Sequence, residues 1–251
     1  MRIDILTLFP EVFEPVLSAS ITGRARAAGL VEWFATDIRR YADNKHNKVD
    51  DRPFGGGPGM VMMCQPLWDC VADVESRDDR KATRILLTPQ GEPLTQKIAE
   101  ELATHARLLM ICGHYEGIDE RVIERLAPRE ISIGDFVVSG GEIPAMLLVD
   151  AVTRLLPGAL GHEASAAEDS FKEWEGVDGG AGSRLLDCPH YTRPRVWEGM
   201  EVPEVLVGGD HGKVDRWRME QMIARTRARR PDLLNETNDE EKRDEPCQRN
   251  C

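Results

Sequence analysis

Apolar and polar positions alternate in short stretches along the first 160 residues of the chain. Ile3, Ile5 and Leu8 alternate with neighbours of mixed polarity, which predicts a strand over residues 2–8 that Phe9-Pro10 closes. Similar apolar runs predict further strands over residues 31–38, 83–88, 107–112 and 130–133. The stretches between them predict helices around residues 12–18, 24–28, 66–74, 94–102, 118–127 and 142–156. This alternation favours an α/β fold with a mostly parallel sheet covered by helices.

Three of these predicted strands end in unusual turns. The turns are Pro89-Gln-Gly91, Gly113 to Gly117 and Gly134 to Gly141. Ligands of parallel sheets bind at the carboxyl ends of strands, and glycine lets backbone amides approach a ligand. We therefore expect the three turns to converge on one crevice and to form the pocket of a small cofactor. Glycines that merely cap strands would explain each turn singly, but they explain the three together less well.

The helix predicted over 142–156 carries start and stop signals. Ser139-Gly-Gly-Glu142 has the spacing of a capping box, and Pro144 suits the first turn of a helix. Pro157-Gly158 ends the pattern. No metal-ligand spacing and no serine elbow accompanies the glycine turns before this helix.

Residues 40–59 form a polar and then glycine-rich connection that ends in Gly55-Gly-Gly-Pro-Gly59. The tract lacks the Gly-Lys-Ser/Thr ending of a phosphate-binding loop, and no apolar strand runs into it, so a nucleoside triphosphate site is excluded. It also lacks the third glycine of a dinucleotide fingerprint. A connection of this length is usually functional or disordered. We expect a loop that becomes ordered on a ligand, and the alternative is a solvated flexible loop.

The C-terminal third of the chain is less regular. Residues 161–170 are small and polar, which is typical of an interdomain linker. Residues 174–184 have the composition of a surface loop, and the prolines of 185–194 require an irregular path. The tail over 236–251 is acidic and has no core residues, so we expect disorder there.

A basic helix is predicted over residues 210–230. After its first residue it has two acidic positions, Asp215 and Glu220, and apolar contacts come from Trp217 and Met222. Its basic residues are Lys213, Arg216, Arg218, Arg225, Arg227, Arg229 and Arg230. Such a face could contact phosphates. A solvated helix whose C-terminal arginines are stabilised by the helix dipole is an equally good interpretation.

Composition and charge narrow the class of protein. The 251 residues are 41% apolar and 30% charged, as in a soluble globular protein of one large or two smaller domains. No apolar stretch is long enough to span a bilayer, and the N-terminus does not resemble a signal peptide. The six cysteines show no zinc spacing, which favours free thiols in a reducing cytoplasm. The net charge of −12 means that binding to RNA requires a local basic face.

Motifs spread over nearly the whole chain resemble one family. They are LFPEVF (8–13), DDRPFGGGPGMVM (50–62), TPQG (88–91), CGHYEGIDERV (112–122), SIGDFVVSGGEIPAM (132–146), PGALGHEASAAEDSF (157–171), LLDCPHYTRP (185–194) and the RRP at 229–231. In this order they resemble the bacterial tRNA (guanine-N1)-methyltransferases of the TrmD type. That family belongs to the SPOUT class of knotted methyltransferases.

The resemblance implies a fold, a reaction and an assembly. It implies a SPOUT domain over 1–160 with S-adenosylmethionine in a deep trefoil knot, a linker over 161–173 and a small, mainly helical tRNA-binding domain over 174–235. It implies methylation of N1 of the guanosine immediately 3′ of the tRNA anticodon, position 37, by a cytoplasmic homodimer whose active sites are shared between subunits. It also implies a need for Mg²⁺, although no carboxylate cage identifies a site. Asp50 and Arg52 would belong to a tRNA-facing loop.

Two residues would carry the chemistry, because methylation at N1 needs a base for the N1 proton and a cation for the charge on O6. By resemblance Asp169 is the base, and we expect it to become ordered with tRNA and cofactor. From the residues alone, Asp169 or Ser170 could instead cap a short helix, with Glu173 completing a capping box. Arg154 is the candidate for O6, and a cation in the last turn of a helix is a compatible interpretation.

The cofactor would lie among the residues of the three turns. Glu116 could balance the sulfonium or accept from the N–H groups of the target guanine, and the alternative is a solvent-exposed loop acid. Tyr115, Phe136 and their apolar neighbours would line the adenine site, or they could simply pack in the core. The full predicted set is Leu87, Thr88, Pro89, Gly113, Tyr115, Glu116, Ile133, Gly134, Asp135, Phe136, Val137, Val138, Gly140, Gly141 and Pro144.

One segment departs from the family pattern. About ten residues between Phe171 and Leu185, beginning at Trp174, are additional, and they bear on the geometry between the domains more than on the chemistry. Two other functions fit parts of the sequence. A knotted methyltransferase of another RNA position, such as a ribose hydroxyl, would not need the linker carboxylate. An RNA-binding protein without catalysis would not need Asp169, Arg154 and Glu116 together.

Overall fold

The computed structural model of the chain describes residues 1–160, 169–174 and 183–234. The chain divides into two compact units, Met1–Glu163 and Ala164–Cys251. The tail over 236–251 and most of the predicted linker therefore lie outside the described residues. Across the described ranges, helices that could cross a membrane are absent.

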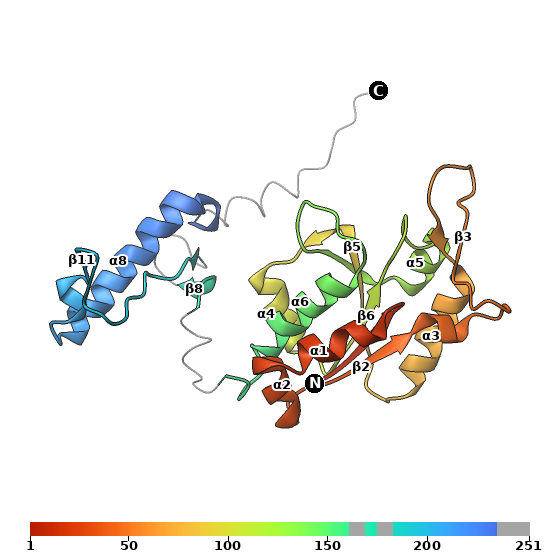
Figure 1. The fold of residues 1–251 in the computed structure, drawn as a ribbon, viewed down its shortest axis with the longest axis horizontal. Helices are drawn as coiled ribbons and strands as arrows, with labels where there is room; N and C mark the ends of the chain where they lie inside the picture. Colours follow the sequence, from red (N-terminus) through yellow and green to blue (C-terminus); the bar gives the residue numbers. More distant parts are fainter. Residues whose placement is uncertain (161–168, 175–182, 235–251) are drawn as a thin grey trace. The chain divides into compact units, whose positions relative to one another are not determined.

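A five-stranded parallel sheet forms the centre of the first unit (Figure 1). Its strand order is β2-β1-β6-β5-β7, and every neighbouring pair is parallel. The strands are β1 (Arg2–Thr7), β2 (Glu32–Asp37), β5 (Thr83–Pro93), β6 (Arg107–Cys112) and β7 (Arg129–Ser132). The predicted α/β class with a mostly parallel sheet is confirmed.

Helices connect the strands of this unit, and one small hairpin lies outside the sheet. The hairpin joins β3 (Asp50–Asp51) to β4 (Val61–Met62). The helices are η1 (Pro10–Val12), α1 (Phe13–Leu17), α2 (Ser20–Ala27), η2 (Ile38–Tyr41), α3 (Cys64–Ser76), α4 (Gln96–Ala103), α5 (Glu120–Leu126) and α6 (Glu142–Thr153). Each predicted helix of this half is present, with ends that differ by a few residues.

Each face of the sheet carries its own hydrophobic core. Along β6 the side chains of Leu108 and Met110 enter one core, and those of Leu109 and Ile111 enter the other. This follows from the two-residue period of a strand. The first core packs against α1, α2, α4 and α6, and the second packs against η2, α3 and α5. Figure 1 shows these two groups of helices on opposite sides of the strands.

Two local predictions in this unit are wrong. The strand expected to stop before Pro89-Gln-Gly91 continues as β5 to Pro93, and its pairing with β7 resumes at Glu92 after an irregularity at Leu87. The expected capping box is absent, because Gly141 is the N-cap of α6 and no side chain caps it. Glu142 instead makes contacts with distant parts of the chain, which are described below. Pro144 lies in the first turn, as predicted.

The described residues of the second unit form one long helix and two short antiparallel strand pairs. The strand pairs are β8 (Lys172–Trp174) with β9 (Ser183–Leu185) and β10 (Val196–Trp197) with β11 (Met200–Glu201). The helical elements are η3 (Glu204–Leu206), α8 (His211–Arg229) and η4 (Pro231–Leu234). The predicted basic helix is confirmed, and Asp210 caps it by accepting from the backbone N–H of Lys213 at 3.1 Å.

The described residues of the second unit exclude one alternative and correct the two ends of an expected loop. The helix that Asp169 or Ser170 could have capped is absent, since β8 follows, and the Ser170 hydroxyl accepts from the backbone N–H of Asp187 at 3.0 Å. The expected surface loop over 174–184 has a paired strand at each end, and Ser183 and Arg184 are buried. Residues 175–182 of that segment lie outside the described residues.

Candidate active site

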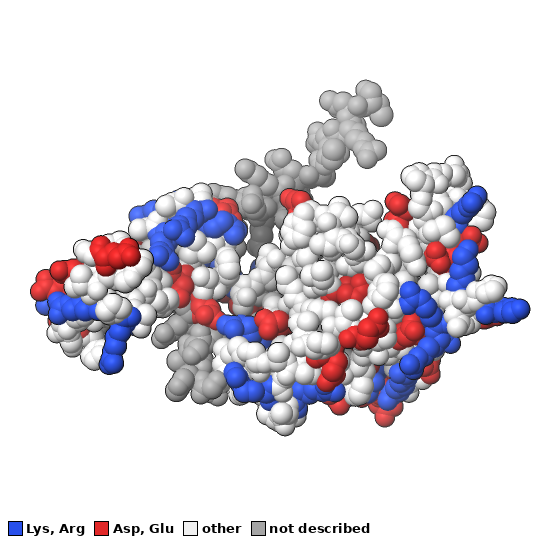
Figure 2. All heavy atoms as spheres, viewed as in Figure 1, with Lys and Arg blue, Asp and Glu red and all other residues white. Residues whose placement is uncertain are grey.

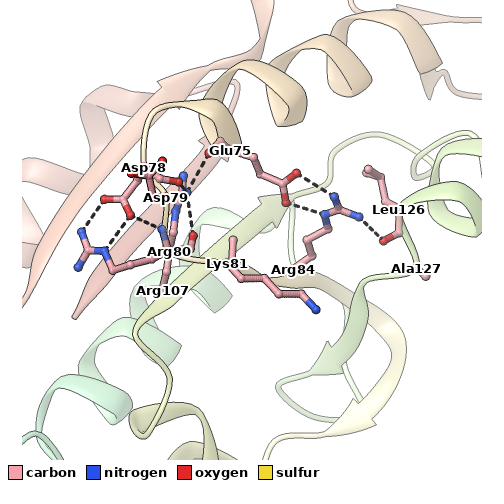
Figure 3. A pocket seen from close by; sticks show the side chains of 10 residues that line it. Glu75, Asp78, Asp79, Arg80, Lys81, Arg84, Arg107, Leu126 and Ala127 are labelled. Atoms are coloured by element: carbon pink, nitrogen blue, oxygen red, sulfur yellow. Dashed lines mark hydrogen bonds and ion pairs between the residues drawn. The ribbon is translucent and has the colours of Figure 1, made fainter.

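A first cavity, of about 430 Å³, lies at the amino ends of β5 and β6 (Figure 3). Arg107 is 1% exposed there and donates to Asp4 at 2.8 Å and to the carbonyl oxygens of Val74 at 2.6 Å and Asp78 at 2.8 Å. The guanidinium therefore caps the C-terminal end of α3, where backbone carbonyls lack helical partners.

Four of the other charged groups of this cavity also bind one another in pairs. Arg84 pairs with Glu75 at 2.7 Å and donates to the Leu126 carbonyl at 2.9 Å. A hydrogen bond from Arg80 holds the pKa of Asp78 well below its ordinary value. Because these groups already have partners within the chain, we interpret the first cavity as structural.

A second cavity, of about 420 Å³, lies at the carboxyl ends of β5, β6 and β7. Its lining includes every predicted cofactor residue except Gly134 and Asp135. The structure thus brings the three predicted turns together around one space. Four further lining residues belong to the predicted turns but were not in the predicted cofactor set: Gln90, His114, Gly117 and Ser139. Sequence reasoning did not single out the other lining residues, which are Leu86, Ile118, Glu120, Ile123, Ile131 and Ser132.

Backbone contacts hold the turns of this cavity close together. The N–H of Gly141 donates to the carbonyl of Gly113 at 2.9 Å, and His114 forms an isolated β-bridge with Gly140. A Cβ on Gly141 would lie 2.5 Å from the Cα of Cys112, and one on Gly91 would lie 2.4 Å from the backbone of Glu130. Glycine is therefore required at these two positions by close backbone approach rather than by a turn.

The glycine-rich tract after residue 54 contacts a loop that lines this cavity. The N–H of Glu116 donates to the carbonyl of Met60, and the N–H of Met62 donates to the carbonyl of Gly117, both at 2.9 Å. A Cβ on Gly59 would lie 2.2 Å from Oε1 of Glu116. The tract therefore packs on the loop that carries the candidate acid, while Phe54 at its start is 97% exposed.

The lining combines exposed apolar groups with a buried polar network. Tyr115, Phe136 and Val137 are all exposed large apolar residues. Beneath them the Glu142 carboxylate binds the Thr7 hydroxyl at 2.6 Å and Nε2 of His114 at 2.7 Å. Sequence reasoning treated Glu142 as part of a helix cap and did not identify this network.

Cys112 lies directly before the glycine of the second turn. Burial raises the pKa of its thiol well above the ordinary value, and the nearby Glu142 carboxylate adds to the effect. A thiol that stays protonated is a poor nucleophile. Cys112 is thus a core residue rather than a reactive group. Within the described ranges the cysteines are free thiols, as predicted: Cys64, Cys70, Cys112 and Cys188.

The two predicted catalytic residues lie outside the lining of the cavity. Arg154 is the C-cap residue of α6 in the first unit and is partly exposed. Asp169 is exposed and belongs to the second unit, just before β8. The structure therefore places each of them at an edge of its own unit, and the cofactor residues alone are gathered in one place.

The second unit carries the basic helix and a possible metal-ligand group. Figure 2 shows Lys and Arg side chains over α8. Exposed Tyr191 lies 6.3 Å from Trp217 of this helix, measured between ring centroids. In the described part of the chain, one group has three metal-ligand atoms within 4.8 Å of one another: Asp187, Cys188 and His190. A thiol is a poor ligand for Mg²⁺, so this group does not fit the predicted ion.

The chain is similar to known proteins over nearly its whole length. The family model described as tRNA (Guanine-1)-methyltransferase TrmD matches residues 1–236. A tRNA (guanine-N(1)-)-methyltransferase of Bacillus subtilis (strain 168) is 53% identical over 234 residues, which cover 93% of this chain and 92% of the relative. The protein of the same name from Rhodopirellula baltica is 52% identical over 237 residues, 94% of this chain and 95% of the relative.

Proposed function

This chain belongs to the TrmD family of tRNA (guanine-1)-methyltransferases, and we propose that it methylates N1 of the guanosine immediately 3′ of the anticodon, position 37 of tRNA. The observation that carries the proposal is identity of about half the residues over more than nine-tenths of the chain. The relatives' names specify the guanine N1 atom, which disfavours the alternative of another RNA position. They also disfavour a protein without catalysis.

The second cavity suits S-adenosylmethionine, which supplies an activated methyl group when bound. Its apolar and aromatic lining offers an adenine site, and its glycines leave backbone groups accessible. Glu116 adds a carboxylate that could lie near the sulfonium. We propose that the predicted cofactor residues bind this molecule and that the three turns form the trefoil knot. The proposed knot rests on the family, and the close backbone passage of Gly141 beside Cys112 is consistent with it.

The proposed mechanism assigns one proton and one charge to residues of this chain. The Asp169 carboxylate would take the N1 proton, which frees the N1 lone pair to attack the methyl carbon as the bond from that carbon to the sulfonium sulfur breaks and its electron pair returns to sulfur. Arg154 stabilises the negative charge that develops on O6 of the guanine. Glu116 accepts from the exposed N–H groups of the guanine and holds its edge toward the methyl group. The exposure of Asp169 is consistent with a base that reaches its position only when tRNA is bound.

A homodimer is supported by an apolar surface on the first unit. Val12 and Val16 at the start of the chain are 37% and 52% exposed, and Ile143 and Leu147 of α6 are 62% and 45% exposed. α1 packs on α6, so these side chains come from neighbouring elements. Exposed apolar surface shared by adjacent helices is typical of an interface. We propose that a second copy of the chain covers it, in the cytoplasm.

The second unit is proposed to bind the tRNA backbone. α8 presents many arginines, and exposed aromatic residues such as Tyr191 and Trp197 offer stacking surfaces. Asp50 and Arg52 of the glycine-tract segment are proposed to contact the same RNA. No step of the mechanism is assigned to Mg²⁺, since the three-ligand group of the second unit does not fit it.

The function is tested by transfer of labelled methyl groups to two tRNA transcripts that differ only at position 37. The transcript with guanosine should be labelled and the one with adenosine should not. Equal labelling of both would overturn the assignment. Asp169→Asn, which keeps the shape of the side chain, should lower kcat by about 10²- to 10⁴-fold while S-adenosylmethionine still binds. A full rate in this variant would remove Asp169 from the role of base.

A further inference from the structure

A buried polar network lies beneath the two loops that line the second cavity. Oε1 of Glu142 accepts from the Thr7 hydroxyl at 2.6 Å, and Oε2 lies 2.7 Å from Nε2 of His114. Glu142 is 7% exposed and Thr7 is fully buried. The network joins the end of β1, the first residue of α6 and the loop after β6, which are far apart in the sequence.

The chemistry of the network fixes the direction of each hydrogen bond. An ionised carboxylate can only accept, so the Thr7 hydroxyl and the His114 Nε2–H must both donate. The first turn of α6 supports the negative charge of Glu142, because a helix N-terminus stabilises anions. The backbone N–H of Phe9 donates to the side-chain oxygen of Thr7 at 2.9 Å. The centroid of the Phe9 ring lies 5.1 Å from that of the His114 ring. The imidazole is therefore held on two sides.

The held imidazole belongs to the loop that shapes the cavity. His114 lies between Gly113 and Tyr115, whose φ of +62° is in the left-handed region. A Cβ on Gly140 would lie 2.2 Å from His114 Nε2 and 2.6 Å from Glu142 Oε2. The turn at Gly140 is thus fitted against the hydrogen-bonded pair itself.

We propose that Thr7, Glu142 and His114 are positioning residues that hold the loop after β6 against the turn before α6 and so keep the cavity in its cofactor-binding shape. Thr7 does not line the cavity, and it acts through Glu142. The two hydrogen bonds of the network restrict the movement of the loop before the cofactor binds, which is preorganisation. The identity of the cofactor rests on the proposed function.

The test is Thr7→Val, which keeps the shape of the side chain and removes the hydroxyl. Titration calorimetry with S-adenosylmethionine should show a Kd about tenfold higher than that of the wild type. At saturating cofactor, kcat and the KM for tRNA should stay within about twofold of the wild-type values, because the substitution weakens only the binding of the cofactor. Thr7→Ser, which keeps the hydroxyl, should restore the wild-type Kd.

Thr22→Val is the matched control, because Thr22 is also buried but bonds to a backbone carbonyl of its own helix, at Ala19. It should leave the Kd unchanged. An unchanged Kd in Thr7→Val, or a lower kcat with an unchanged Kd, would overturn the proposal in favour of a purely structural role. If Thr7→Val does not fold, Glu142→Gln keeps an acceptor for Thr7 and removes the charge. Its Kd should rise several-fold, and an unchanged value would again overturn the proposal.

The experiment also separates this proposal from the proposed function. A wild-type protein that does not bind S-adenosylmethionine contradicts the function, and the positioning role falls with it. A wild-type protein that binds the cofactor no better than Thr7→Val contradicts the positioning role alone.

Discussion

The two cavities of the first unit have nearly the same volume but opposite chemistry. The cavity at the amino ends of the strands is lined by charged side chains such as Arg84 and Arg107, which bind neighbouring carboxylates and carbonyls. The cavity at the carboxyl ends is lined mainly by glycines, loop backbone and apolar side chains, and its carboxylates are those of Glu116 and Glu120. Volume therefore does not distinguish a binding site from a structural recess.

The difference lies in where the polar groups find their partners. In the first cavity the Arg107 guanidinium donates hydrogen bonds to backbone carbonyls at and after the end of α3. A ligand would have to replace these existing hydrogen bonds. In the second, the strong polar contacts lie beneath the loops, at Glu142, and the surface above them keeps accessible backbone and aromatic groups. Paired charges stabilise the fold, and the exposed loop surface is left for a ligand.

The largest expected effect is the loss of Arg107. Arg107→Leu removes a buried partner of the Asp4 carboxylate and the guanidinium donor shared by the carbonyls at the end of α3, so it should lower the free energy of unfolding by about 3–5 kcal/mol. Urea denaturation measures this value. The Kd for S-adenosylmethionine of the folded fraction should be unchanged, and a large rise would mean that the two cavities are coupled.

The next effect concerns the second cavity. Gly141→Ala places a Cβ 2.5 Å from the Cα of Cys112, and it must move the turn before α6. We expect the Kd for S-adenosylmethionine to rise more than about tenfold, or roughly 1.4 kcal/mol, with a loss of stability of about 1–3 kcal/mol. Gly208→Ala is the control, because its Cβ has ordinary contact distance to the nearest atom, at 3.5 Å. Equal affinities in both variants would contradict the close fit of the turns.

The smallest effect is a pH dependence of the free energy of unfolding, which arises from a core thiol and not from the ligand site. Burial raises the pKa of Cys70 on α3 from its ordinary value of 9.0 to about 12. The unfolded chain loses this proton near pH 9 and the folded chain only near pH 12, so the free energy of unfolding falls as the pH rises between these values. Between pH 8 and pH 10, Cys70→Ala should remove about 1 kcal/mol of this fall, measured by urea denaturation. The same difference should persist at saturating cofactor, since Cys70 does not line the second cavity.

The hydrophobic periodicity predicted those elements whose ends and faces are determined by burial or by local caps. β6 runs over the predicted residues 107–112 because both of its faces are buried, and α8 begins after the predicted Asp210, whose carboxylate accepts from the first turn. Residues that contact distant parts of the chain were misread. Glu142 has the spacing of a local cap, but its partners Thr7 and His114 are 135 and 28 residues away.

Prediction of the functional residues has the same limit, because contacts between distant parts of the chain cannot be read from periodicity. The three turns and most cofactor residues could be placed in one cavity, because strand order and glycine spacing carry that information. The roles of Asp169 and Arg154 came from resemblance to a family, and they remain predictions. The bond between Arg107 and Asp4 spans 103 positions and joins the starts of β1 and β6, so it follows from the strand order, which periodicity alone does not give.

The hydrogen bonds of Arg107 also determine which substitutions this part of the chain tolerates. Apart from Asp4, its acceptors are main-chain carbonyls, at Val74, Glu75, Asp78 and Arg80. Any residue type supplies a carbonyl, so substitutions at those four places leave the acceptors of this guanidinium in place. For the hydrogen bonds of this guanidinium, mutational sensitivity is thus concentrated in the side chains of Arg107 and Asp4.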